Sequence, residues 1–389
     1  MRRLDALTGI RALAALWVVL FHLSTGLINF GSLTPLFSRG YLGVDLFFLL
    51  SGFIISYAHQ KDFLNIRKKL LVQFLWMRLA RIMPVHWFIL SLFLINFLVR
   101  VQLVGTHPGD EIHFSFWSFI CHTLNIQAWG LTHPLTWNYP AWSVSAEWFA
   151  YLLFPWLKVL TVRINSPKLN LLAGAVLWLS FYLTALALGK NGSINWCDAY
   201  SLIRVTAEFT TGMLLYNIYK IQLQKPASGT LDGWFGLVLL VCVLGIYTNW
   251  SDFIVVPFLA VLIYALSFAG SACRAIFANR PMIYLGEISY SLYMVDAFLT
   301  MLYLQLTKLL PALSSLQNIP ALFIMVKILV SVACAHCLFT YVEKPSRNYL
   351  RDCIHKGFRM PTFFKRKADF KSELEIKAQV ESKLSGLIP

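Results

Sequence analysis

Ten apolar runs, each about as long as a bilayer-spanning helix, set the main constraint on how this chain can fold. A helix needs about 20 apolar residues to cross the hydrocarbon core of a membrane. The 389 residues are 58% hydrophobic and 13% charged, against roughly 45–50% and about 25% in soluble domains. We therefore expect an all-α polytopic membrane protein with about ten transmembrane helices, at residues 10–28, 41–58, 84–104, 142–160, 169–188, 201–219, 234–249, 253–270, 284–305 and 320–342.

The basic residues are distributed unevenly among the segments that connect these runs. Most of the 33 lysines and arginines fall in segments that share one side of the membrane if the N-terminus is cytoplasmic. By the positive-inside rule, both termini are then predicted to be cytoplasmic. The net charge of +15 therefore reflects topology and attraction to anionic headgroups, and it does not indicate nucleic-acid binding.

Two segments depart from this pattern. Residues 105–140 form a long connection, neither clearly spanning nor plainly polar, in which we expect a re-entrant or interfacial helix. Residues 344–389 have the composition of a soluble segment, so the chain divides into a transmembrane domain, 1–343, and a basic cytoplasmic tail, 344–389. Lys365-Arg366-Lys367 and the mixed charges after it indicate either a helix on the membrane surface or a solvated tail without chemistry.

The seven cysteines are scattered and mostly lie inside apolar runs, where they are typical of small buried hydrophobic residues. Cys334 and Cys337 have CxxC spacing, but no second pair of ligands accompanies them. We therefore expect neither a disulfide framework nor a metal site.

Ionisable residues inside the apolar runs are the strongest functional signal, because a charge in the bilayer is costly and usually marks a functional site. Arg11 and His22 are eleven residues apart, which places them on one face of a helix, about 16 Å apart along its axis. A long ligand with an anionic head and a reactive far end would fit such a stripe. Alternatively, Arg11 reaches the inner headgroups and His22 bonds to a neighbouring helix. The other residues of this kind are Asp45, Glu147, Arg204, Glu208, Glu287, Asp296 and Lys327.

Two carboxylates are expected at the same depth as His22. Asp45 and Glu147 each lie near the predicted outer end of an apolar run. A carboxylate beside an imidazole can fix its tautomer and raise its basicity. The sequence does not show which helices are neighbours, so this argument concerns depth alone. Arg204 and Glu208, one helical turn apart, would neutralise each other.

A pair of arginines precedes the third apolar run. Arg78 and Arg81 are spaced to share one helix face just before Met83-Pro84, where a helix is expected to start. Guanidinium groups bind phosphates in a bidentate manner, so the pair predicts a phosphate site; anchoring at the cytoplasmic surface is the alternative.

Tryptophans are concentrated near the predicted outer face. An aromatic belt at the membrane interface is the simpler interpretation, and a platform for stacking sugars is the other. The cluster comprises Trp117, Trp129, Trp137, Trp142, Trp148 and Trp156.

Taken in order, these segments resemble the membrane-bound acyltransferase 3 family, which includes O-acetyltransferases of bacterial surface polysaccharides and nodulation factors. The resemblance extends from residue 4 to about residue 347. It is carried by Leu4-Asp5-Ala6-Leu7-Thr8-Gly9-Ile10-Arg11 running to His22, by Gly43-Val44-Asp45-Leu46-Phe47-Phe48, by Arg78-Leu79-Ala80-Arg81, by Trp142-Ser143-Val144-Ser145-Ala146-Glu147, by 204–212, by Gly286 to Tyr293, and by Glu343-Lys344-Pro345-Ser346-Arg347. Asp296 stands where many members carry His, and Ala6 and Thr8 also depart from the usual opening motif.

The resemblance implies a protein of the bacterial inner membrane. Its reaction would transfer an acyl group, most often acetyl, from cytoplasmic acyl-coenzyme A to a hydroxyl of an extracytoplasmic or lipid-linked glycan. In that interpretation His22 is the general base, and Arg11, Arg78 and Arg81 hold the donor phosphates. Glu147 or Asp45 would orient His22 or the acceptor. A covalent acyl-histidine relay is an open alternative. The competing class is a proton-coupled transporter or flippase, which would also carry intramembrane charges.

Overall fold

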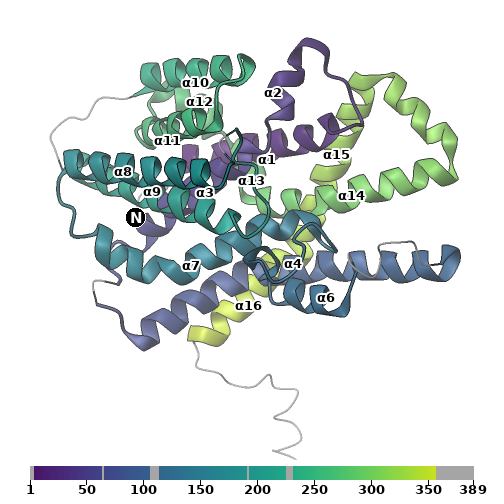
Figure 1. The fold of residues 1–389 in the computed structure, drawn as a ribbon, viewed down its shortest axis with the longest axis horizontal. Coiled ribbons are helices and arrows are strands. Elements are labelled where there is room, and N and C mark those ends of the chain that lie inside the picture. The colour runs from purple at the N-terminus through teal and green to yellow at the C-terminus, as the bar shows by residue number, and fades with distance from the viewer. Residues whose placement is uncertain (1–3, 64, 106–113, 191, 225–230, 356–389) are drawn as a thin grey trace, which may run out of the picture.

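The protein is described by a computed structural model that covers residues 4–63, 65–105, 114–190, 192–224 and 231–355. Within these ranges the regular structure is entirely helical, which agrees with the predicted all-α class (Figure 1). The helices are α1 (Asp5–Ser24), α2 (Thr34–Ser38), α3 (Leu42–Ala58), α4 (Lys68–Val104), α6 (Phe116–Thr123), α7 (Trp142–Thr161), α8 (Pro167–Ala187), α9 (Ser201–Gln222), α10 (Asp232–Tyr247), α11 (Asp252–Ser267), α12 (Ser271–Phe277), α13 (Arg280–Glu287), α14 (Ser289–Leu309), α15 (Pro320–Leu338) and α16 (Lys344–His355).

Each of the ten apolar runs contains a helix, and several of these helices could cross a membrane. By length and hydropathy, five stretches of the described residues qualify: Asp5–Ser24, Gly31–Ala58, Lys68–Leu103, Pro167–Ala187 and Pro320–Cys353. A sixth qualifies if α11 and α12, which meet at an angle of 107°, form one broken span. The protein is therefore a multi-pass membrane protein by composition. The count of ten spans and the cytoplasmic position of both termini stay predictions.

Helix α4 corrects the prediction that a helix starts at about Pro84. It is one continuous helix of 37 residues, and Pro84 lies inside it (Figure 1). The residues before Pro84 include many strong helix formers, so the loss of one backbone hydrogen bond does not end the helix. Arg78 and Arg81 therefore project from the body of α4. The helix is about 56 Å long, well beyond the ~30 Å hydrocarbon core.

The long connection at 105–140 contains short helical pieces. These are α6, which packs against α4, and two 3-10 turns, Gln127–Trp129 and Tyr139–Ala141. The hydroxyl of Ser115 accepts a hydrogen bond from the backbone N–H of Ser118 (3.2 Å) and so caps the start of α6. A helix thus exists in this segment, while its re-entrant or interfacial placement stays a prediction.

At the C-terminal end, α15 continues through a π-helical segment, Phe339–Glu343, into α16. Helix α16 packs against α4, so the first residues after 343 lie on the helical body (Figure 1). The surface helix predicted after Lys365 lies outside the described residues, and the division at residue 343 stays a prediction.

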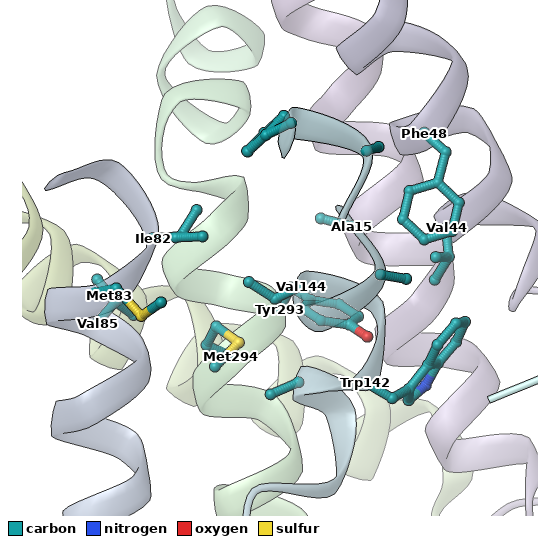
Figure 2. Packing of buried hydrophobic residues seen from close by; sticks show 14 of the residues in the cluster. Ala15, Val44, Phe48, Ile82, Met83, Val85, Trp142, Val144, Tyr293 and Met294 are labelled. Carbon is teal, nitrogen blue, oxygen red and sulfur yellow. The ribbon is translucent and has the colours of Figure 1, made fainter. Parts of the chain in front are cut away.

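Five helices build one of the hydrophobic cores of the protein. Figure 2 shows side chains of α1, α3, α4, α7 and α14 meeting there, and the cluster includes Ala15, Phe48, Ile82, Trp142 and Met294. Buried apolar side chains pack as densely as organic crystals. Any polar group that this core encloses is therefore surrounded by closely packed apolar side chains.

Glycines allow some helices to approach with backbone against backbone. A Cβ atom at Gly52 of α3 would lie 1.9 Å from the carbonyl oxygen of Phe209 on α9, and one at Gly212 would lie 2.1 Å from that of Leu49. Gly9 of α1 and Gly286 of α13 make the same kind of contact with Phe277 and Thr8. The helices can stay this close only while these positions lack side chains.

We expect Gly52→Ala to destabilise the protein by about 1–3 kcal/mol, because the methyl group would force α3 away from α9. A lower thermal midpoint of the detergent-purified protein would show this. Gly236→Ala is the matched control, because a Cβ atom there meets no atom within 4 Å. If both variants melted like the parent protein, the close approach of α3 and α9 would be wrong.

Candidate active site

A cavity of about 100 Å³ lies among α1, α3, α4, α7 and α14. It brings together four residues that the sequence predicted to act at one site: Arg11, Arg78, Arg81 and Glu147. His22 and Asp45 do not line it. Other polar side chains in its wall are Ser51, Ser143, Tyr151, Ser289, Tyr290 and Tyr293.

The arginines of this cavity are only partly satisfied by the protein. Arg11 donates to the Ser289 hydroxyl (3.1 Å), and the Arg78 guanidinium lies over the rings of Phe74 and Tyr151, 5.6 and 5.9 Å from their centroids. The Nε atoms of Arg11 and Arg78 are buried and have no hydrogen-bond partner among the described residues. Because a buried polar group without a partner is costly, these guanidinium groups favour an anionic ligand.

Glu147 is the carboxylate of the cavity wall. It accepts hydrogen bonds from the hydroxyls of Ser51 and Tyr151, the latter at 2.5 Å. One carboxylate against three arginines leaves the cavity with an excess of positive charge, which suits a phosphate-bearing ligand.

His22 contacts neither Asp45 nor Glu147, the two carboxylates that were predicted at its depth. Its Nδ1 atom lies 2.8 Å from Oδ2 of Asp296, which is 1% exposed, whereas the His22 side chain is 16% exposed. Nε2 of His22 has no hydrogen-bond partner within the ranges that the structure covers. With Nδ1–H donated to Asp296, Nε2 carries the lone pair of the neutral imidazole and can accept a proton.

Asp296 is itself held by α15. Lys327 Nζ lies 2.8 Å from its Oδ1 and donates to the Thr300 hydroxyl at 2.8 Å, and the Ser331 hydroxyl donates to Oδ1 at 3.1 Å. The sequence marked Asp296 and Lys327 as intramembrane charges but assigned them no role. The sequence did contain a signal for this contact. Asp296 and Lys327 carry opposite charges in the last two apolar runs, and each needs an oppositely charged partner inside the membrane.

Asp45 contacts Arg204, with Nε–Oδ1 at 2.8 Å and Nη2–Oδ2 at 2.7 Å, and both side chains are completely buried. Glu208 is farther from Arg204, at 3.6 Å. The predicted neutralisation of Arg204 by Glu208 is therefore incomplete, because Asp45 is the closer and bidentate partner. This arrangement favours a structural role for Asp45.

The His22–Asp296 pair and the arginine cavity are built on the same two helices. Arg11 and His22 both belong to α1, while Tyr290 and Tyr293 of the cavity wall and Asp296 all belong to α14. Asp296 is three residues, or about one helical turn, beyond Tyr293. The same two helices thus carry an anion-binding end and an acid–base end.

The fold and this site define a multi-pass membrane protein with an arginine-lined cavity and a nearby histidine–carboxylate pair. A model of an acyltransferase domain matches residues 4–340. The chain therefore belongs to the acyltransferase 3 family, as its motifs indicated.

The chain is also similar to curated bacterial proteins. It is 24% identical over 397 residues to O-acetyltransferase OatA of Staphylococcus aureus (strain NCTC 8325 / PS 47), covering 94% of this chain and 60% of the relative. It is 24% identical over 384 residues to the peptidoglycan O-acetyltransferase OatA of Listeria monocytogenes, covering 92% and 58%. For the putative peptidoglycan O-acetyltransferase YrhL of Bacillus subtilis the values are 25%, 92% and 56%. The chain thus spans about 60% of the length of these relatives. No solved structure matches it.

We expect Asp45→Asn to destabilise the protein by about 3–5 kcal/mol, because Arg204 would remain buried without its carboxylate. Thermal unfolding in detergent measures this change. Lys190→Ala is the control, since its contact with Asp198 (3.2 Å) is partly exposed and worth at most about 1 kcal/mol. A stable but inactive Asp45→Asn protein would instead indicate a catalytic role.

Proposed function

We propose that this protein is an integral-membrane O-acyltransferase that moves an acyl group from cytoplasmic acyl-coenzyme A to a glycan hydroxyl. The acyl group is proposed to be acetyl, because the relatives are named O-acetyltransferases. The acceptor is an extracytoplasmic or lipid-linked glycan, which agrees with the peptidoglycan named for two of the relatives. The observation that carries the proposal is the arginine cavity and the His22–Asp296 pair on the same two helices.

The donor is proposed to bind with its phosphates toward the arginine cavity. Coenzyme A has a phosphate-rich head and a long arm that ends in a thioester. Arg11, Arg78 and Arg81 supply charge-assisted hydrogen bonds for the head. The arm would then run along α1 toward His22, a rise of about 16 Å from Arg11. Glu147, among the arginines, would orient their guanidinium groups.

The proposed transfer uses His22 as general base. Nε2 takes the proton of the attacking glycan hydroxyl while its oxygen bonds to the thioester carbonyl carbon. The carbon–sulfur bond then breaks, and the leaving thiolate takes the proton back from His22, so that the products are the glycan ester and free coenzyme A. Asp296 holds Nδ1–H and stabilises the imidazolium that forms in between. Lys327 neutralises the carboxylate when His22 is uncharged.

We expect His22→Gln to lower acyl transfer by about 10²–10⁴-fold, because the base is lost while the amide keeps similar polarity. Ester-linked acetate, released by mild alkali from the surface glycans of a deletion strain carrying the variant, measures the effect. Asp296→Asn should lower kcat with an unchanged KM for the donor, and Asp296→Glu should restore part of it. Full activity of His22→Gln at normal protein levels would reject the assignment.

Replacing both Arg78 and Arg81 by Ala should weaken acyl-coenzyme A binding by at least about 100-fold, because two charge-assisted contacts are lost. Binding of labelled acetyl-coenzyme A to the purified protein measures this change. The control replaces Arg163 and Arg274, which are exposed and lie outside the cavity, by Ala. Equal affinities in both double variants would contradict the proposed donor site.

A further inference from the structure

A second cavity, of about 300 Å³, lies between the C-terminal halves of α4 and α14. The Trp137–Tyr139 segment, which precedes α7, closes one of its sides. The charge distribution predicts that this end of both helices faces the extracytoplasmic side. The lining residues that carry polar groups are Asn96, Arg100, Thr136, Trp137, Tyr139 and Gln305.

Aromatic rings form one wall of this cavity. The ring centroids of Phe97 and Phe114 are 4.7 Å apart, and those of Phe97 and Trp137 are 5.2 Å apart. The guanidinium of Arg100 lies 5.2 Å from the Phe97 centroid. The wall thus offers flat apolar faces beside a cation, an arrangement that suits a ligand with both apolar faces and polar edges.

Trp137 has two unusual features. Its φ is +31°, which is rare and strained for a residue with a side chain. Its side chain is 5% exposed, and its Nε1–H has no hydrogen-bond acceptor among the residues described. Strained backbone and unsatisfied buried donors are both found where a protein holds a ligand.

Two amides complete the polar side of the cavity. Asn96 Nδ2 donates to Gln305 Oε1 at 2.7 Å, and Gln305 Nε2 donates to Asn96 Oδ1 at 3.1 Å. An amide has two N–H donors and two lone pairs, so this reciprocal pair leaves one donor and one acceptor on each side chain for another partner. The amides also hold each other in position, which fixes the direction of the remaining groups.

A single turn separates the two cavities. Tyr139 lines the second cavity, while the carbonyl of Pro140 accepts a hydrogen bond (2.7 Å) from the hydroxyl of Tyr293, which lines the arginine cavity. Met301 of the second cavity's wall also lies five residues, or a rise of about 8 Å, beyond Asp296 on α14. The second cavity is therefore a neighbour of the reacting groups.

We propose that the second cavity binds one sugar ring of the acceptor glycan. The C–H faces of a pyranose would stack on the aromatic wall, and its hydroxyls would bond to the amides and to the indole N–H of Trp137. This inference rests on the proposed acyltransferase function. It assigns the acceptor to a site distinct from the donor cavity.

The test measures acyl transfer from acetyl-coenzyme A, by the purified protein in lipid vesicles, to surface glycan extracted from a strain that lacks the gene. Trp137→Phe keeps a ring in the aromatic wall but removes the indole N–H, and Asn96→Ala breaks the amide pair. Each should raise the KM for the glycan by about tenfold or more, with donor binding unchanged. Trp117→Phe is the matched control, because this indole is exposed, lies outside the cavity and bonds to the Leu131 carbonyl.

An unchanged KM for the glycan in both cavity variants, with normal transfer by the parent protein, would overturn the acceptor site and leave the proposed function intact. A rise in KM of the same size in Trp117→Phe would also overturn it. Failure of the parent protein to transfer acetyl would reject the proposed function, and the acceptor site with it. Asn96→Ala keeps the test decisive if Trp137→Phe does not fold.

Discussion

The pairing of one buried carboxylate, Asp296, determines how the acid–base end of this bundle is built. A carboxylate inside a membrane protein is tolerated when cations and hydrogen-bond donors surround it. Asp296 meets this need with Lys327, Ser331 and His22, which come from α15 and α1. The same interaction that makes Asp296 tolerable therefore joins three helices and fixes the orientation of the imidazole. The orientation of His22 relative to α14 and α15 therefore depends on one ion-paired carboxylate.

The helical class and the positions of the apolar helices could be predicted, because they follow from composition and from apolar runs along single helices. The family resemblance, not helix periodicity, implied that Arg11, Arg78 and Arg81 act together, and the structure places them with Glu147 around one cavity. The partner of His22 could not be obtained in this way, because it depends on which helices are neighbours. Asp45 and Asp296 are both intramembrane carboxylates, and only the packing assigns Asp45 to Arg204 and Asp296 to His22.

Close backbone contacts explain how that packing is specified. Gly9 of α1 lies against Phe277, and Gly286 of α13 lies against Thr8, so both contacts occur at the end of α1 that carries Arg11. Helices that approach this closely can do so in few relative positions, since any shift brings side chains into the gap. The glycines therefore contribute to the site without touching it, because they set the position of α1 relative to α12 and to α13, which leads directly into α14.

Helices α4 and α14 are long enough to reach from the arginine cavity to the second cavity. Each helix contributes to both cavities: α4 through Arg81 and Asn96, and α14 through Tyr290 and Gln305. Each pair is fifteen residues apart, which corresponds to a rise of about 22 Å along a helix. The two helices thus hold the amide pair of Asn96 and Gln305 at a fixed distance from the arginine cavity. A donor arm about 20 Å long would therefore bring its thioester to the acceptor end while its phosphates remain at the arginines, so transfer across the bundle would not require the helices to move.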